Sequence, residues 1–518
     1  MKLYALRATH EILVHPVSNF SINGTEYGLP YPSLYGKLKY LKLDSSDLSP
    51  GDLTKIMRNR SILILKAQEI FTSKPHWDVF SAMIKSPKHT LLLVVPKNKD
   101  VLQGPKKCDD AHATTFAQAE LPKCEDSKVY QESLIKLEEL FKVAKCPIGI
   151  IQDGDEIEEV CKLASANGGL LSDEIRLITR QFEPSSVSKF SSFNLFGSLK
   201  NQTLDDSAPT LLITAPLDTF NFVQTISSTA GYNTPLVALL ELVKIFGQGL
   251  PIKGPLPWKV KFLLTTGTVV DFYGLKYFLK KEKVDFAIAL DDLSGDSLYV
   301  HGGFVDDKTQ GFVKALKSVL GAEFKERDSS GTEFYFAHDV FTKHKIPAVT
   351  ITSVERGVLL PLRLSSFHFR FNPNVLSDKI SKIAESLVKF FNGKSKKVDV
   401  KPESLLSWDT LLSEPRNTFE ADISGLKSVA LVVEHLEEYL NLEKETFKTS
   451  VSTSVIKSPS VNKATVYASK HAIFDIFIAT AVFSYIFLVW SVVRTPKNAI
   501  KEIGGILSVF VNPKSHKE

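Results

Sequence analysis

The sequence predicts an α/β protein: a doubly wound mixed sheet, preceded by a small N-terminal α/β lobe and followed by a C-terminal single transmembrane helix. Short apolar runs bounded by turn residues alternate with segments of helical periodicity, first with short elements and then with longer ones. Strands that alternate with helices are typical of a mainly parallel sheet. One apolar run near the C-terminus is long enough to cross a bilayer.

The N-terminal lobe is expected to contain three short strands and a helix. The predicted strands are residues 61–66 (SILILK), 90–96 (TLLLVVP) and 147–152 (PIGIIQ). Between the last two, residues 128–145 carry leucines and a phenylalanine at helical spacing. This order predicts a small unit with a mainly parallel sheet.

The second section repeats the pattern with longer elements. Its predicted strands are residues 210–215, 260–266, 286–290 and 348–352, all short apolar runs. Thr234 followed by Pro235 is a helix-start signal, since threonine caps a helix and proline suits its first turn. Further helices are expected over residues 272–281, 309–320 and 379–391. These elements predict the doubly wound domain but leave function open.

The remainder of the chain is divided by composition. A charged linker is expected after Gly393, an amphipathic helix over 423–442, and a polar Ser/Thr/Lys-rich stretch over 444–465. The expected domains are an N-terminal lobe (1–165), an α/β domain (166–395), a linker and helical juxtamembrane region (396–472), the transmembrane helix (473–493) and a tail (494–518).

The predicted transmembrane helix carries one charge, Asp475, near one end. A helix of that length rises about 31 Å, which matches the hydrocarbon thickness of a bilayer. Asp475 is a candidate for a polar contact within the membrane, with placement at the interface as the alternative. The tail is more basic than the flank before the span, which predicts a cytosolic tail and a lumenal body.

That topology needs an N-terminal signal, and the opening residues MKLYALRATHEILVHP contain no apolar stretch of the required length. Either the start is incomplete or processed, or the chain is tail-anchored with a cytosolic body. Four Asn-X-Ser/Thr sequons favour the lumen. These candidate glycosylation sites are Asn19, Asn23, Asn59 and Asn201.

Composition and cysteines narrow the class further. Of the 518 residues 43% are hydrophobic and 23% charged, which excludes a disordered or low-complexity chain. A net charge of +5 over this length is no nucleic-acid footprint. The four cysteines lack CxxC or zinc-finger spacing, so they form disulfides in an oxidising compartment or are buried free thiols. They are Cys108, Cys124, Cys146 and Cys161.

Common catalytic motifs are absent. The sequence has no GxSxG elbow, no HExxH pair and no Walker loop. Open α/β sheets place their sites at the carboxyl ends of the strands, so a site is expected there in the second domain.

The order of segments in that domain is similar to the zinc aminopeptidases of the M28 class, and more closely to their nicastrin-like pseudoenzyme relatives. The resemblance is carried by TLLITAPLDTF, NTPLVALLELVKIF, VKFLLTTGTVVDFYGLKYFL, ALDDLSGDSLYVHGG, IPAVTIT and SSFHFRF. HEILVHPVSNFSINGTEYG and KHAIFDIFIATAVFSYIFLVW extend it to residues 8–495. It implies a sheet of the zinc-aminopeptidase type.

Residue by residue, the resemblance implies a degenerate metal site. An active member holds two zinc ions with histidine and carboxylate ligands. The expected HxD motif is occupied by Pro216, Leu217 and Asp218, and proline offers no ligand. Asp218 matches the carboxylate that would orient the missing histidine. The metal-bridging aspartate is expected within 230–233, which reads Ala-Gly-Tyr-Asn.

The remaining positions of the family site are only partly kept. The adjacent glutamate pair, one ligand and one general base, falls on Thr268 and Val269. Asp291 survives at the next strand end, and His368 matches the last ligand position. Two ligands without a base do not support hydrolysis, so no catalytic residue and no cofactor are expected. Asp292 and Asp296 are expected as turn and cap residues rather than as a calcium cluster.

The resemblance implies a non-catalytic, single-pass glycoprotein of the endoplasmic reticulum membrane that belongs to a translocon-associated complex for multipass membrane proteins. Its implied partners are the Nodal modulator protein and a small multipass membrane protein. Two alternatives stay open: a nicastrin-like substrate receptor of a membrane protease complex, and an active membrane-bound aminopeptidase with a rearranged site.

Overall fold

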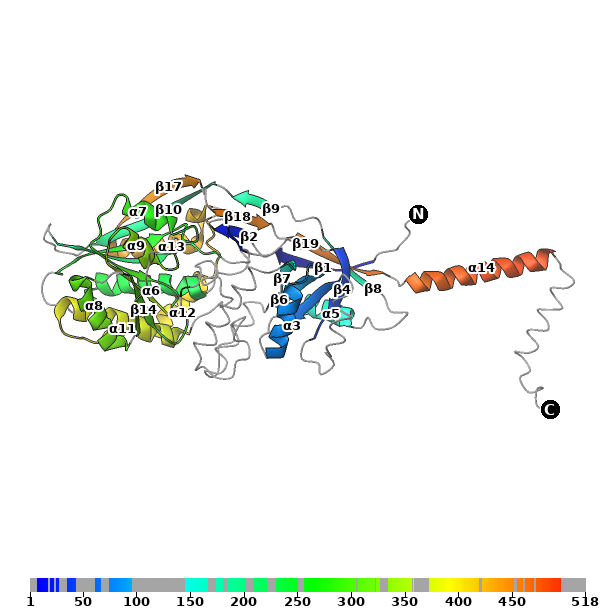
Figure 1. Ribbon diagram of the computed structural model, residues 1–518, viewed down its shortest axis with the longest axis horizontal. Coiled ribbons are helices and arrows are strands. Elements are labelled where there is room, and N and C mark those ends of the chain that lie inside the picture. Colours follow the sequence, from blue (N-terminus) through cyan, green and yellow to red (C-terminus); the bar gives the residue numbers. More distant parts are fainter. Residues whose placement is uncertain are drawn as a thin grey trace, which may run out of the picture.

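The computed structural model contains a large α/β domain, a small four-stranded sheet, a closed barrel and a C-terminal helix, which follow one another along the long axis (Figure 1). The residues it describes are 7–16, 19–22, 25–27, 35–42, 61–66, 74–95, 145–165, 174–179, 184–187, 189–200, 208–220, 230–249, 256–303, 306–321, 323–326, 334–355, 357, 372–418, 422–450, 454–459, 462–469 and 472–494.

The large domain contains an eight-stranded mixed sheet in the order β15-β14-β16-β13-β11-β12-β10-β17. The central strands β12, β11, β13 and β16 are parallel, and β10, β14 and β17 introduce antiparallel pairs. The strands are β10 (Lys189–Leu199), β11 (Thr210–Pro216), β12 (Lys259–Thr265), β13 (Phe286–Leu290), β14 (Tyr299–Gly302), β15 (Glu323–Glu326), β16 (Ala348–Thr352) and β17 (Leu440–Ser450).

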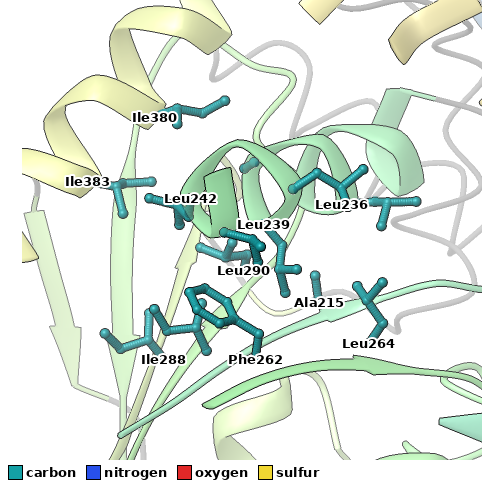
Figure 2. Packing of buried hydrophobic residues seen from close by; sticks show 14 of the residues in the cluster. Ala215, Leu236, Leu239, Leu242, Phe262, Leu264, Ile288, Leu290, Ile380 and Ile383 are labelled. Atoms are coloured by element: carbon teal, nitrogen blue, oxygen red, sulfur yellow. The ribbon is translucent and has the colours of Figure 1, made fainter. Parts of the chain in front are cut away.

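Helices cover both faces of this sheet, which confirms the doubly wound prediction. One face packs against α6 (Ala230–Gly247), α8 (Asp307–Leu320), α11 (Pro373–Asn392), α12 (Pro402–Leu411) and α13 (Lys427–Tyr439). The other packs against α7 (Tyr273–Leu279) and α9 (Ala337–Lys343). Figure 2 shows leucines of α6 on the strand side chains beneath them. Burial of these apolar surfaces holds the layers together.

The expected elements of this domain are present with small shifts. The predicted strands correspond to β11, β12, β13 and β16. Almost every residue of these four strands is buried. Helix α6 begins at Ala230, before the expected cap at Thr234, and contains Pro235.

The N-terminal part forms a closed barrel in the order β1-β19-β8-β4-β5-β6-β7, which mixes parallel and antiparallel pairs where a mainly parallel sheet is expected. The three predicted strands are β5, β6 and β7, and they are parallel neighbours as expected. Antiparallel strands β1, β8 and β19 close the barrel. Its strands and helices are β1 (Arg7–Pro16), β4 (Tyr35–Tyr40), β5 (Ile62–Lys66), β6 (Thr90–Val95), β7 (Ile148–Gln152), β8 (Glu174–Thr179), β19 (Asn462–Ser469), α3 (Lys74–Ile84) and α5 (Asp155–Ser165). The expected helix 128–145 lies outside the described residues.

A two-stranded ribbon joins the three sheets. Strands β8, β9 and β10 follow one another along the chain, and they pair with β19, β18 and β17 in the barrel, the small sheet and the large sheet respectively. The small sheet has the order β3-β2-β18-β9. Its strands are β2 (Asn19–Ile22), β3 (Thr25–Tyr27), β9 (Pro184–Val187) and β18 (Ser454–Pro459).

The structure differs in part from the linker and helical juxtamembrane region expected over 396–472. The expected amphipathic helix is present as α13, which follows the short 3-10 turn η3 (Ile423–Gly425) and packs its apolar residues into the large domain. The polar stretch after it forms β17, β18 and β19. Strand pairing, which apolar content does not reveal, accounts for the difference: every residue of β17 has a register partner on β10.

The expected transmembrane segment forms α14 (Ala472–Arg494), which begins shortly after β19 and extends away from the barrel (Figure 1). Most of its large apolar side chains are exposed, with Phe483 at 73% and Tyr485 at 70%. Over the part of the chain that the structure describes, no helix meets the combination of length and apolarity needed to cross a membrane. The span therefore stays a prediction.

Candidate functional site

The expected site lies where the parallel strands β12, β11 and β13 end. These strands are neighbours, so the residues that follow them meet at one edge of the sheet. The structure brings Pro216 and Asp218, Thr268 and Val269, and Asp291 to this edge, and all five are buried. His368 lies outside the described residues. The described residues expected at the site therefore lie at one edge of the sheet, and Asp218 and Thr268 are hydrogen-bonded to each other there.

Asp218 is held by the loop that follows β12. Gly267 N–H donates to its Oδ2 at 2.7 Å, and the Thr268 hydroxyl donates to its Oδ1 at 2.7 Å. Weaker bonds come from the Thr268 N–H at 3.4 Å and the Thr418 hydroxyl at 3.3 Å. Gly267 has a φ of 66°, a conformation that glycine adopts without steric cost, and this turns its N–H toward the carboxylate. Both oxygens of Asp218 are therefore engaged.

Burial dominates the protonation of Asp218. It raises the pKa of this carboxyl to about 6, against the hydrogen bonds from Thr268, Gly267 and Thr418, which lower it. Asp218 is 1% exposed, so its charge is poorly solvated. Pro216 occupies the expected histidine position and offers no imidazole, and the hydrogen bonds of Asp218 fix the loop after β12.

A buried arginine lies beside this carboxylate. Arg416 is fully buried and comes from the segment between α12 and η3. Its Nε donates to the Leu217 carbonyl at 2.8 Å, and its Nη2 donates to the Asn233 Oδ1 at 2.9 Å. Burial lowers the pKa of Arg416 to about 10, while Asp218 and Glu414 raise it, so the guanidinium is charged at neutral pH. This cation bridges the end of β11 and the first turn of α6.

The loop after β13 is fixed by a second buried cation, Lys379 of α11. Its Nζ donates to the carbonyls of Leu293, Gly295 and Ser297 and to the Ser353 hydroxyl. Burial lowers the pKa of Lys379 to about 8, opposed chiefly by the charge of Asp292.

Asp292 has the turn role expected of it. Its Oδ1 accepts from the N–H of Ser294 at 2.9 Å. Asp296 lines a cavity beside α11 with Lys379 and Asp378.

These residues do not fit the two zinc ions that an active member of the resembling family holds. Zinc takes histidine, cysteine and carboxylate ligands. Pro216 and Val269 offer none, both oxygens of Asp218 accept hydrogen bonds, and the Arg416 guanidinium adds a positive charge at the same edge. Among the described residues, no group of three or more His, Cys, Asp or Glu side chains is placed to hold a metal ion.

Sequence reasoning missed the two cations and Thr418. Arg416 had one available signal: it is the only arginine between Arg370 and Arg494, a stretch otherwise supplied with lysine. Arginine is preferred where a buried cation makes several directed hydrogen bonds. Lys379 carried no signal, because it was expected only as the first residue of a helix.

The other candidate residues that the structure describes lie away from this edge. Cys146 is a buried free thiol that donates to the His89 carbonyl at 3.2 Å, and Cys161 is buried on α5. Asn19 begins β2. Those outside the described residues are Cys108, Cys124, Asn23, Asn59 and Asn201, together with the side chain of Asp475 on α14.

The fold is similar to that of nicastrin, whose structure is described as that of the gamma-secretase component. The TM-score is 0.55 with 12% identity, and the match covers 89% of this chain and 100% of that one. At this identity the likeness shows the fold alone. The expected nicastrin-like fold is thereby confirmed, and it extends over both the barrel and the large domain.

Two peptidases show weaker likeness. An M28 peptidase precursor from Shewanella amazonensis matches with a TM-score of 0.30 and 14% identity over 77% of this chain and 84% of its own. A zinc aminopeptidase from Bacillus subtilis matches with a TM-score of 0.29 and 10% identity over 77% and 88%. These TM-scores are too low to establish a shared fold by themselves. No family model and no curated protein matches the sequence.

Proposed function

We propose that this chain is a non-catalytic subunit of a membrane protein complex, with the large domain as a rigid contact surface and α14 as its anchor. The observation that carries the proposal is the buried Arg416–Asp218 arrangement. It fills the edge of the sheet with hydrogen-bonded side chains. Among the residues that the structure describes, no group of side chains there could hold a zinc ion. A nicastrin-like fold over 89% of the chain supports a role in assembly.

In its finer form, the proposal is a nicalin-like protein of the endoplasmic reticulum membrane, with a lumenal body and a cytosolic tail. Its complex would be associated with the translocon and would assist the insertion of multipass membrane proteins. The proposed partners are the Nodal modulator protein and a small multipass membrane protein. Support for this form comes from the resemblance across residues 8–495 and from the charge asymmetry around residues 473–493.

One experiment tests whether the chain is catalytic. The full-length protein, purified in mild detergent, is assayed for bound zinc by mass spectrometry and for hydrolysis of a panel of aminoacyl and aminopeptide substrates. We expect less than one zinc per ten chains and no hydrolysis above a protein-free blank. Stoichiometric zinc together with turnover would establish an active aminopeptidase with a rearranged site and refute the proposal.

A second experiment tests the complex. The tagged full-length chain is recovered from membranes in mild detergent, and co-purifying proteins are quantified against a chain lacking residues 472–518. We expect translocon subunits and the two proposed partners at constant ratio. Presenilin-type proteases in their place would favour the second candidate, a substrate receptor of a protease complex, which the fold of nicastrin favours. Recovery of the chain alone would refute both.

A further inference from the structure

We propose that residues 412–418 form an internal ligand that closes the strand-end site, with the Arg416 guanidinium in the place of a bound cation. This inference goes beyond the proposed function, because it assigns a structural occupant to the site whichever complex the chain joins. The segment lies between α12 and η3 and is folded against the loop after β11.

The backbone of the segment is paired to the site in both directions. Thr219 N–H donates to the Arg416 carbonyl at 2.8 Å, and Arg416 N–H donates to the Thr219 hydroxyl at 2.8 Å. Two residues later, the Thr418 hydroxyl donates to Asp218. These contacts bridge about 200 positions of sequence, so they are tertiary contacts and not the local geometry of a turn.

The side chain of Arg416 uses its fork of donors to join three elements. Nε binds the Leu217 carbonyl after β11, and Nη2 binds Asn233 in α6. Nη1 donates to the Leu412 carbonyl at 2.8 Å and the Glu414 carbonyl at 3.4 Å, which folds the segment around its own guanidinium. A buried cation with this many directed bonds is well satisfied, and a lysine at the same place would reproduce only part of them.

The contacts of Arg416 lie at the positions where metal ligands are expected. Leu217 lies between the two residues that match the HxD motif, and Asn233 lies where the bridging aspartate is expected. The guanidinium therefore links the two places that a metal ion would link in a metal-binding relative. Lys379 holds the loop after β13 through three carbonyls, so two buried side-chain cations fix the loops after β11 and β13.

The proposal predicts chemical rescue by a guanidinium ion. In the full-length chain in detergent, Arg416→Gly removes the cation and leaves a cavity of its shape. We expect the midpoint of thermal unfolding to fall by about 5–15 °C, because breaking a buried charge network is strongly destabilising. Addition of about 20 mM guanidinium chloride, a concentration far below the denaturing range, should restore at least half of the loss. Equal concentrations of sodium or tetramethylammonium chloride should not.

Leu405→Ala is the matched control. Leu405 is fully buried on α12, close to the segment in sequence, and its truncation lowers the midpoint without removing a cation. Guanidinium should not rescue this variant or wild type. Rescue of Arg416→Gly by sodium to the same extent, or no rescue by guanidinium, overturns the proposal.

A second variant carries the test if Arg416→Gly does not fold. Arg416→Lys keeps the charge but loses the fork, so we expect a midpoint below wild type by several degrees. In a further arm, zinc chloride is added to wild type and to Arg416→Lys, and it should raise the midpoint of thermal unfolding of neither protein. A lysine variant as stable as wild type, or stabilisation of the wild type by zinc, overturns the proposal.

Discussion

Asp218, expected from the family resemblance to orient a metal ligand, is held by hydrogen bonds from neighbouring loops. The carboxylate that would orient a metal-bound histidine here accepts from Gly267, Thr268 and Thr418. Because the burial of Asp218 raises its pKa to about 6, the native state binds a proton more tightly than the unfolded chain, whose value is near 3.8. Linkage then makes the contribution of Asp218 to stability largest below about pH 4 and smaller as the pH rises through 6.

Asp218→Asn provides a direct test of this linkage. The amide does not titrate, so the free energy of unfolding of wild type minus that of the variant isolates the carboxyl. A pKa of about 6 against 3.8 corresponds to about 3 kcal/mol, and we expect the difference to be larger at pH 4 than at pH 7 by up to that amount. Denaturant titrations at the two pH values measure it. A difference that grows toward pH 7 would show that the carboxylate, and not the acid, is the form that the interior prefers.

Cys146 gives a second prediction at this scale. It is buried beside β7, and burial raises the pKa of its thiol to about 12, so almost none of it is thiolate at neutral pH. In a variant that keeps Cys146 and replaces the other three cysteines by serine, labelling by a maleimide should be at least about 1,000-fold slower in native than in denatured protein. Rapid labelling of the native chain would contradict the packing of β7.

At the scale of elements, the sequence predicts those that are buried on both sides. The runs that form β11, β12, β13 and β16 are mostly apolar and mostly buried, as is typical of central parallel strands. Strands β17, β18 and β19 were read as linker because their side chains are largely polar. Their partners lie more than 240 residues away in β10, β9 and β8, and no local pattern reports such pairing.

The candidate site also contains residues that the sequence places and one that it does not. Pro216, Asp218, Thr268 and Asp291 could be placed at one edge from sequence, since each follows a predicted parallel strand. Arg416 could not, because the segment that carries it enters the site from beyond two further helices. Contacts of this kind depend on tertiary packing, which periodicity does not encode.

The approach of α7 to the sheet gives a prediction for one element. A Cβ at Gly274 would lie 2.2 Å from the Thr266 carbonyl oxygen and 2.6 Å from Asn194 Oδ1, and the first of these is backbone that cannot turn away. Gly274→Ala should therefore destabilise the protein by about 3 kcal/mol, as overpacking against rigid atoms does. The control is Gly425→Ala, where a Cβ meets no atom within 4 Å and we expect a change within about 0.5 kcal/mol. Equal effects in denaturant titrations would refute the assigned packing of α7.

At the scale of the whole molecule, the ribbon of β8–β10 and β17–β19 connects the large sheet, the small sheet and the barrel. It pairs antiparallel in all three sheets, and β19 ends at Ser469, just before α14 begins at Ala472. The barrel therefore lies next to α14, while the large domain lies at the far end (Figure 1). If α14 is the anchor, the barrel is the part nearest the membrane and the large domain is presented to partners at a distance.

Conversion of exposed apolar residues of α14 to charges tests that arrangement. Phe483→Arg combined with Phe487→Arg places two cations in the middle of the helix, where each costs about 2.5–3.5 kcal/mol on insertion scales. We expect wild type to resist alkaline carbonate extraction and the double variant to be released into the soluble fraction. The two substitutions leave all four sequons in place.

Leu406→Arg with Leu411→Arg is the matched control, because these leucines of α12 are also exposed, at 48% and 41%, but lie in the large domain. That variant should stay with the membrane. Glycosidase-sensitive glycans on wild type would place the sequons in the lumen, as the proposed orientation requires. Wild type that is extracted by carbonate, or that is anchored but carries no glycan in a cell that glycosylates a lumenal reporter, would contradict the anchor or the orientation respectively.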